Sequence, residues 1–181
     1  MPLSVKNGIN RPILEGRHKW LGGVMIDGSV YAVPSHARHV LCLDIARRQF
    51  TPIARDSGEL EGKFKWLRGQ VMKDGENGGS LCFYCIPAHS ETILKVQPSE
   101  NKVRHIAIPH GLGEGEWKWH GSAAVDDYIY TIPANAEHVL QICTADDSVS
   151  ALPSETGQPF IGKNKWYGGI AARGRVYGVP Y

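Results

Sequence analysis

One motif recurs four times along this chain of 181 residues and constrains its fold more than any other feature. Each copy reads Gly-x-x-Lys-Trp, followed by a glycine-rich apolar stretch, a tight turn and a second apolar stretch that ends at a proline. The Lys-Trp pairs are Lys19-Trp20, Lys65-Trp66, Lys118-Trp119 and Lys165-Trp166. A period of about 47 residues is typical of an array of similar stacked units.

Each copy predicts four short antiparallel strands. In the first copy they cover residues 20–26, 29–33, 40–45 and 49–54, with Asp27-Gly28 as a hairpin turn and Pro34 ending the second strand. From Trp to the closing Pro takes 14 residues in three copies and 21 in the second, because of a longer turn at 74–80. Further strands are expected at 81–86, 92–96, 103–108, 128–132, 139–143, 148–152 and 176–179. The predicted fold class is therefore an all-β propeller of four-stranded repeats.

We interpret residues 1–181 as one β-propeller domain with three complete repeats and one partial repeat. The repeats cover approximately 16–61, 62–114, 115–161 and 162–181, with 1–15 completing the last blade. We favour closure of a four-bladed ring by pairing of the N-terminal strand with 176–179. Otherwise the blade edges stay open for a partner, since two such chains could form a seven-bladed ring, or the sequence is a fragment of a longer product.

The motif also carries a resemblance to known repeats. The best matching segments are 165–169, Lys-Trp-Tyr-Gly-Gly, and 176–180, Val-Tyr-Gly-Val-Pro. They resemble the Lys-Trp-x-Gly-Gly…Ile-Tyr-Gly-Ile-Pro repeats of largely uncharacterised eukaryotic microbial proteins, which are kelch-like and WD-like blades in the broad sense. The chain lacks the paired-glycine kelch signature with its Tyr/Trp spacing, and it lacks the Gly-His…Trp-Asp pair. The resemblance implies a propeller fold and implies no activity.

Composition limits the partners and the compartment. The net charge is +2 with acids and bases interspersed, which argues against nucleic acid, and no apolar stretch is long enough for a membrane span. Four cysteines in a chain without an N-glycosylation sequon favour an intracellular location, cytoplasmic rather than in an organelle. Cys82 and Cys85 lie three apart on one strand and therefore on opposite faces, so we interpret them as buried thiols.

The candidate ligand-binding residues come from two loops of each repeat that should share one face of the blade. The loop before the first strand supplies four lysines, and the turn after the second strand supplies a polar residue two positions beyond the proline. The candidates are Lys19, Lys65, Lys118, Lys165, His36, His89 and Asn135. Such a lysine ring could bind an anionic ligand or an acidic segment. The alternative is that each Lys lies along its Trp and supports the fold, because a structural residue must recur in every blade.

No catalytic motif, phosphate loop or dinucleotide fingerprint occurs, and the histidines lack metal-ligand spacing. The sequence thus predicts no catalytic residue, no cofactor and no metal. We expect a non-catalytic scaffold for protein–protein interaction, alone or within a larger assembly, with a protein partner or self-association through open blade edges. The alternative is a propeller enzyme, or a binder of a small ligand or carbohydrate, that uses the axial channel face.

Overall fold

The computed structural model describes residues 14–54, 58, 60–76 and 78–181 as four antiparallel sheets, which we call the first to fourth blades. The first blade contains β1 (Trp20–Ile26), β2 (Ser29–Pro34), β3 (Val40–Asp44) and β4 (Gln49–Ile53). The second contains β5 (Trp66–Lys73), β6 (Leu81–Pro87), β7 (Thr92–Gln97) and β8 (Lys102–Ala107), with a 3₁₀ turn, η3 (Pro98–Glu100), between the last two. The third contains β9 (Trp119–Val125), β10 (Tyr128–Pro133), β11 (Val139–Cys143) and β12 (Val149–Leu152). The fourth contains only β13 (Trp166–Ala172) and β14 (Arg175–Pro180).

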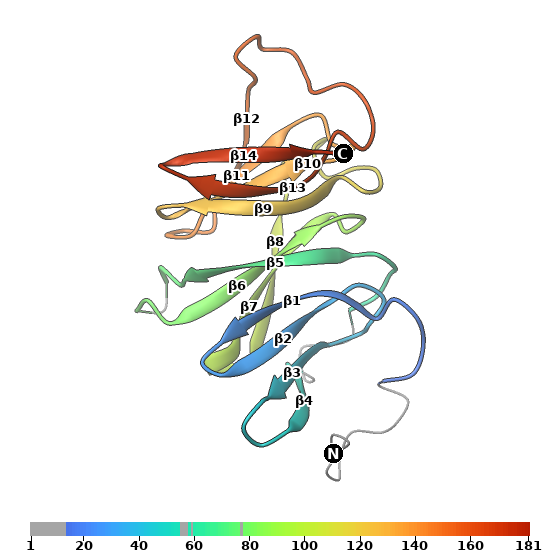
Figure 1. Ribbon diagram of the computed structural model, residues 1–181, viewed down its shortest axis with the longest axis vertical. Helices are drawn as coiled ribbons and strands as arrows, with labels where there is room; N and C mark the ends of the chain where they lie inside the picture. The colour runs from blue at the N-terminus through green and yellow to red at the C-terminus, as the bar shows by residue number, and fades with distance from the viewer. Residues whose placement is uncertain (1–13, 55–57, 59, 77) are drawn as a thin grey trace.

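The all-β class and the four-stranded repeat are confirmed, and the predicted strand ends agree with the observed ones to within one or two residues. The first strands of the blades, β1, β5, β9 and β13, lie one beside another in that order (Figure 1). The first and fourth blades lie at opposite ends of this row (Figure 1). The predicted pairing of the N-terminal strand with residues 176–179 involves residues outside the described part of the chain.

Two apolar cores hold the blades together, and each contains one of the repeated tryptophans. Trp66 is buried between the first and second blades, and Trp119 is buried between the second and third. Strand β6 is buried on both faces: Phe83 and Cys85 contribute to the first core, and Cys82 and Tyr84 to the second. The prediction that the two thiols face opposite ways is confirmed.

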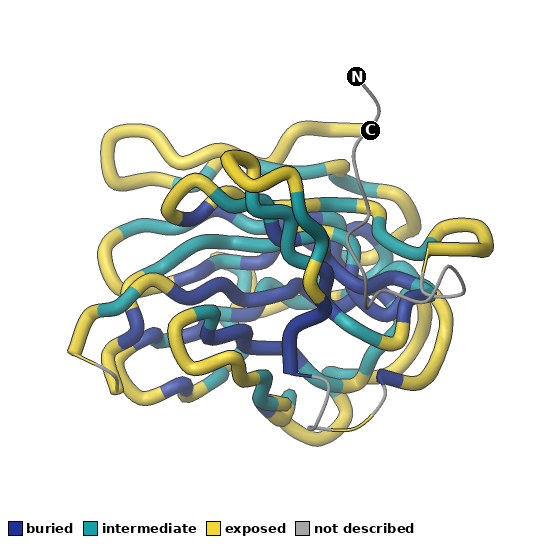
Figure 2. The backbone as a smooth tube through the Cα atoms, turned by 90° about the horizontal axis from the view of Figure 1, so that it is seen from below, coloured by how far each residue is buried: buried dark blue, intermediate teal, exposed yellow. Residues whose placement is uncertain are grey.

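Each repeated tryptophan of a four-stranded blade also makes the same hydrogen bond. Its indole Nε1 donates to the carbonyl oxygen of the residue five positions after the blade's proline, at 3.0, 2.7 and 2.9 Å for Trp20, Trp66 and Trp119. The fourth blade has no third strand in the described structure, and its hairpin is exposed along much of its length (Figure 2).

A β-bulge follows the tryptophan in all four first strands. The pairing with the second strand shifts by one residue between Trp20 and Gly22, and equivalent shifts occur after Trp66, Trp119 and Trp166. A bulge re-aims the side chain of the extra residue. At Gly22 the backbones approach so closely that an added Cβ would lie 2.2 Å from the carbonyl oxygen of Leu67. A glycine is therefore required at this position.

Candidate functional site

The repeated lysines bind main-chain carbonyl groups. Lys65 is buried, and its Nζ donates to the carbonyl oxygens of Ser35 at 2.7 Å, Ala37 at 3.0 Å and Gly62 at 3.1 Å. Lys165 repeats the pattern with Ala134 and Gly162, both at 2.9 Å, and Lys118 is buried with Gly115 at 3.0 Å. Lys65 and Lys165 thus join each loop to the preceding blade. Burial lowers the pKa of Lys65 and of Lys118 to about 8.

Three of the lysines also lie near the ring of the tryptophan that follows them. The distances from Nζ to the ring centroid are 5.4 Å for Lys19, 5.8 Å for Lys65 and 5.9 Å for Lys118, which is within cation–π range. These contacts give the Lys-Trp pair a structural role in the first three blades. Ligand binding by the four lysines stays a prediction, and in this structure the amino groups of Lys65, Lys118 and Lys165 hold the fold.

The other three candidates lie where the sequence places them, beside the lysine loops on one face. His36 donates its backbone N–H to the carbonyl of His18, His89 to Phe64, and Asn135 to Trp117, at 3.0–3.1 Å. Each candidate also contacts the residue before the lysine in the next blade. The ring centroids of His36 and Phe64 are 4.3 Å apart, those of His89 and Trp117 are 4.7 Å apart, and Asn135 Oδ1 accepts the backbone N–H of Asn164 at 2.9 Å.

The two ring pairs, His36 with Phe64 and His89 with Trp117, belong to a continuous row of rings across all four blades, which we call the ring row. Neighbouring ring centroids are 4.3–5.7 Å apart along its length. The ring row consists of His18, His36, Phe64, His89, Trp117, His120, Tyr167 and Tyr181. Only part of this row was expected from the sequence, because contacts between blades depend on the curvature of the array.

Backbone conformation makes the ring row unusual. His18, Phe64, Trp117 and Asn164 occupy one position of the repeat, and all four have a positive φ between 47° and 53°. Glycine or asparagine tolerates this left-handed conformation best, whereas a bulky side chain adopts it at a cost of about 1 kcal/mol or more. Asn164 and His18 suit the position better than the other two residues, so the rings of Phe64 and Trp117 are held there against some backbone strain.

Three imidazoles of the ring row each keep an unpaired nitrogen. The Nε2 atoms of His36, His89 and His120 are buried and have no hydrogen-bond partner among the described residues. Burial lowers the pKa of all three histidines, and the Arg68 charge lowers that of His120 further. These rings are therefore neutral at pH 7, and each could still donate or accept one hydrogen bond.

A pocket of about 280 Å³ opens beside the ring row, where the first strands of the four blades meet. Its walls include the residue after the repeated tryptophan in every copy, because the bulge turns that side chain inward. It is lined by Leu21, Leu67, Arg68, Trp117, His120 and Tyr167. We call it the axial pocket.

Arg68 is the residue of the axial pocket that departs most from the repeat. The same position is Gly22, Gly121 and Gly168 in the other copies. Its aliphatic stem lies about 4 Å from where a Cβ on Gly121 would be, so the missing side chain of the third blade makes room for it. Residues that recur in every copy were selected from the sequence, and Arg68 was therefore missed. The replacement of the repeated glycine by arginine in the second copy alone was the signal that could have identified it.

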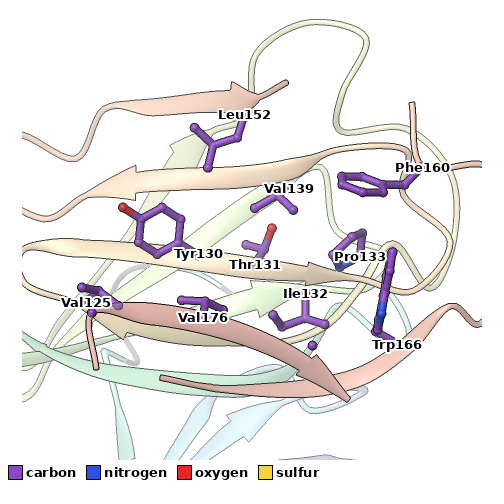
Figure 3. A pocket seen from close by; sticks show the side chains of 12 residues that line it. Val125, Tyr130, Thr131, Ile132, Pro133, Val139, Leu152, Phe160, Trp166 and Val176 are labelled. Atoms are coloured by element: carbon purple, nitrogen blue, oxygen red, sulfur yellow. The ribbon is translucent and has the colours of Figure 1, made fainter. Parts of the chain in front are cut away.

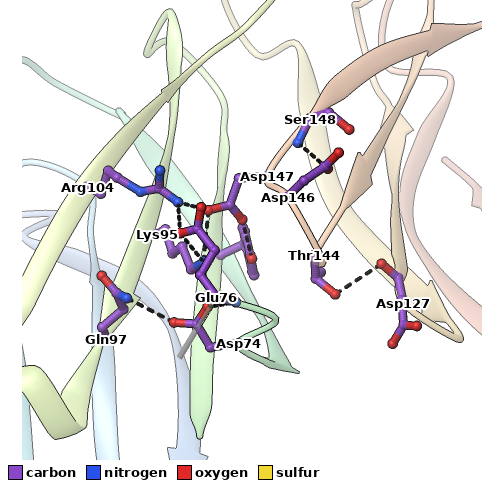
Figure 4. Close-up of polar contacts among 11 residues, drawn as sticks. Asp74, Glu76, Lys95, Gln97, Arg104, Asp127, Thr144, Asp146, Asp147 and Ser148 are labelled. Carbon is purple, nitrogen blue, oxygen red and sulfur yellow. Dashed lines mark hydrogen bonds and ion pairs between the residues drawn. The ribbon is translucent and has the colours of Figure 1, made fainter. Parts of the chain in front are cut away.

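A second polar cluster joins the second and third blades away from the ring row (Figure 4). Lys95 is fully buried and donates to Asp74 and Asp147, both at 2.8 Å. Arg104 pairs with Asp147 and with Glu76, and Tyr84 donates to Asp147 at 2.5 Å. The longer turn of the second copy supplies Asp74 and Glu76, so the additional residues of that turn have a structural role in this cluster. We call this cluster the ionic latch.

An apolar groove of about 370 Å³ lies between the third blade and the hairpin of the fourth (Figure 3). Phe160 and Trp166 stand at one end of it, with Tyr130, Val139 and Leu152 along the third blade and Val176 on β14. The two preceding blade interfaces fill the corresponding space with second and third strands. Two further strands on β14 would therefore complete the fourth blade.

The described ranges contain no group of three His, Cys, Asp or Glu side chains close enough to hold a metal ion. No helix within the described part of the chain has the length and apolar character needed to cross a bilayer.

No protein-family model and no curated protein matches this sequence, but solved structures share its fold. A catalytically inactive virginiamycin B lyase from Staphylococcus aureus, solved with quinupristin, has a TM-score of 0.64 at 12% identity, over 90% of this chain and 49% of that chain. The extracellular domain of a putative one-component system from Bacteroides thetaiotaomicron has a TM-score of 0.59 at 13% identity, over 87% and 19%. A protein of unknown function from the latter species has a TM-score of 0.56 at 13% identity, over 90% and 38%.

These likenesses show the fold class: the chain is built as a β-propeller. They do not single out kelch-type blades. The chain spans only about a fifth to a half of the length of the structures that it matches.

Proposed function

We propose that this protein is a non-catalytic propeller scaffold that binds a protein partner through the ring row. The observation that carries the proposal is the unbroken line of partly exposed rings across four blades. Aromatic side chains are enriched in protein interfaces, since they offer a large contact area at a low cost in conformational entropy.

Backbone strain supports this role independently. Phe64 and Trp117 occupy left-handed positions at which asparagine would be easier to accommodate, as Asn164 is in the fourth blade. Strain of this kind is commonly found at functional sites. A purely structural loop gains little from a bulky ring at that position, so contact with another molecule is the better explanation.

A second candidate is a small-ligand or carbohydrate binder, or a propeller enzyme, that uses the same face. The axial pocket favours it, because Arg68 and His120 offer polar contacts beside the rings of Trp117 and Tyr167. One structural neighbour is a lyase, so the fold accommodates catalysis. The pocket lining has no carboxylate for acid–base chemistry, which is why the binding role is preferred.

The open fourth blade supports a place in a larger assembly. The groove beside β14 could accept strands from a partner or from a second copy of the chain by β-augmentation. We also place the protein inside the cell, in keeping with four cysteines that are all free thiols.

The test is site-specific photo-crosslinking in the cells that express the protein. A benzoylphenylalanine at position 64 should give a discrete adduct with one partner, whereas the same residue at exposed position 25, near a hairpin turn, should not. With the purified partner, Phe64→Asn should weaken binding about 30-fold, as expected for loss of an aromatic hot spot. Met25→Ser is the matched control. Equal adducts at both positions, or unchanged binding by Phe64→Asn, would contradict the proposal.

A further inference from the structure

We propose that the axial pocket binds a carboxylate group of the partner, held by Arg68 beside the rings of Trp117, His120 and Tyr167. This inference rests on the proposed scaffold function and specifies the chemistry that its binding face recognises. It differs from the sequence-based expectation of an anion held by the four lysines, because it assigns the charge to a residue that occurs once.

The residues that line the pocket differ between the repeats, which indicates a binding site and not only a consequence of the repeated fold. The bulge presents the residue after each tryptophan to the axis, and the four copies there are Leu21, Leu67, His120 and Tyr167. Two neighbouring blades thus contribute apolar side chains, and the next two contribute polar aromatic ones. A fold-building position would keep the same residue type in every copy, as the lysine and tryptophan do.

The charge in the pocket favours an anion. Arg68 is exposed, and no salt bridge to it is formed within the described structure. His120 lies close enough for the Arg68 charge to lower its pKa, and its Nε2 has no partner among the described residues. A guanidinium binds a planar carboxylate through two parallel hydrogen bonds.

The loops around the pocket carry charges of both signs. Exposed cations occupy one position of the lysine loop in three repeats, at Arg17, Lys63 and Lys163, with Glu116 in the third copy. Acidic side chains also act on the repeated lysines, namely Glu61, Glu91 and Glu137. The preference for an anion therefore rests on Arg68 itself.

The shape of the pocket specifies what the carboxylate is attached to. The rings of Trp117 and Tyr167 lie on either side of His120, with centroids 5.6 and 5.0 Å from it. Leu21 and Leu67 add an apolar wall. A volume of about 280 Å³ has room for a carboxylate together with one attached aromatic ring. An acidic residue next to an aromatic residue in a partner segment fits this description.

Three probes test the inference by NMR titration of the Trp117 indole N–H. Phenylacetate carries a ring and a carboxylate, phenylacetamide is its uncharged counterpart, and a capped Phe-Glu dipeptide presents the carboxylate as a protein would. We expect the dipeptide and phenylacetate to shift the Trp117 signal and phenylacetamide to bind at least about tenfold more weakly. Equal binding of phenylacetate and phenylacetamide would overturn the carboxylate assignment. If phenylacetate bound more tightly than the dipeptide, a partner protein would be ruled out as the source of the bound carboxylate.

Variants identify the residue responsible. Arg68→Gln should weaken phenylacetate binding about tenfold and abolish the preference over phenylacetamide, because the bidentate contact is lost. Arg48→Gln, in the exposed β3–β4 turn, removes the same charge elsewhere and should bind like the wild type. Wild-type binding by Arg68→Gln would refute the proposal.

The same variants separate the two proposals. If Arg68→Gln leaves partner binding intact while Phe64→Asn abolishes it, the carboxylate inference fails and the scaffold function stands. If neither variant weakens partner binding, the scaffold function itself is wrong.

Discussion

Two residues on the same face of this protein have opposite roles, and their hydrogen bonds distinguish them. Lys65 points inward and satisfies three main-chain carbonyls of two loops. Arg68, three residues later, is exposed at the axial pocket. A cationic side chain on this face can therefore be assigned to ligand binding only if it is not already hydrogen-bonded within the fold.

Replacing Lys65 by methionine should therefore destabilise the fold. The change keeps an apolar stem but removes the ammonium group that donates to the carbonyls of Ser35, Ala37 and Gly62, and we expect a loss of about 2–3 kcal/mol in the free energy of unfolding. Urea denaturation followed by tryptophan fluorescence measures it. Lys63→Met, at an exposed position of the same loop, should change stability by less than about 0.5 kcal/mol. A stable Lys65→Met protein that had lost partner binding would favour the lysine-ring hypothesis instead.

At the scale of elements, the interface between the second and third blades combines an apolar core with the ionic latch. The long β5–β6 turn reaches the β11–β12 turn: the backbone N–H of Gly75 donates to the carbonyl of Thr144 at 3.2 Å, and an added Cβ at Gly75 would lie 2.6 Å from Ala145 Cα. This contact holds Asp74 and Asp147 on either side of Lys95. The latch therefore fixes the angle between two blades as well as closing their interface.

Lys95→Met should cost more stability than any change at an exposed ion pair. It leaves Asp74 and Asp147 buried without their shared cation, and removal of one partner of such a pair typically costs about 3–5 kcal/mol. Thermal unfolding with circular dichroism checks this prediction. Arg47→Met, which breaks the exposed pair with Asp44, serves as the control and should be almost neutral. Equal effects of the two substitutions would show that the latch contributes nothing beyond a surface ion pair.

The strands were predictable from the sequence, whereas the latch and the axial pocket were not. Hairpin turns, prolines and apolar runs are local signals, so the strands whose bounds were predicted from the sequence were placed to within one or two residues. It also brought His36, His89 and Asn135 to one face, because adjacent loops of a blade are fixed by strand pairing. Lys95 and Asp147 are 52 residues apart, and no local pattern joins them. The pocket depends on bulges and on the angle between blades, which the spacing of motifs does not specify.

At the scale of the whole molecule, the described blades form a row with two unlike ends. The match to the lyase covers 90% of this chain but 49% of that chain. In this chain the apolar groove beside β14 marks where the next strands would pack. A second copy of the chain is one source of them, as the seven-bladed alternative supposes.

Light scattering on a sizing column tests this form of self-association. If a second copy completes the ring, the species should have about twice the chain mass of 19.9 kDa, because two open arcs can bury each other's apolar edges, whereas the favoured closure within one chain predicts a monomer. Val176→Lys puts a charge in the groove and should yield the monomer, whereas Ile45→Lys, in an exposed turn, should leave the mass unchanged. A wild-type monomer would argue against completion of the ring by a second copy.

Strand β6, which is buried on both faces, gives the molecule two built-in chemical reporters. Cys85 faces the core shared with the first blade, and Cys82 faces the core shared with the third. Burial raises the pKa of both thiols, so an alkylating reagent reaches either one only after the blades on that side have separated. The order in which the two thiols become reactive in rising denaturant would therefore reveal which pair of blades parts first.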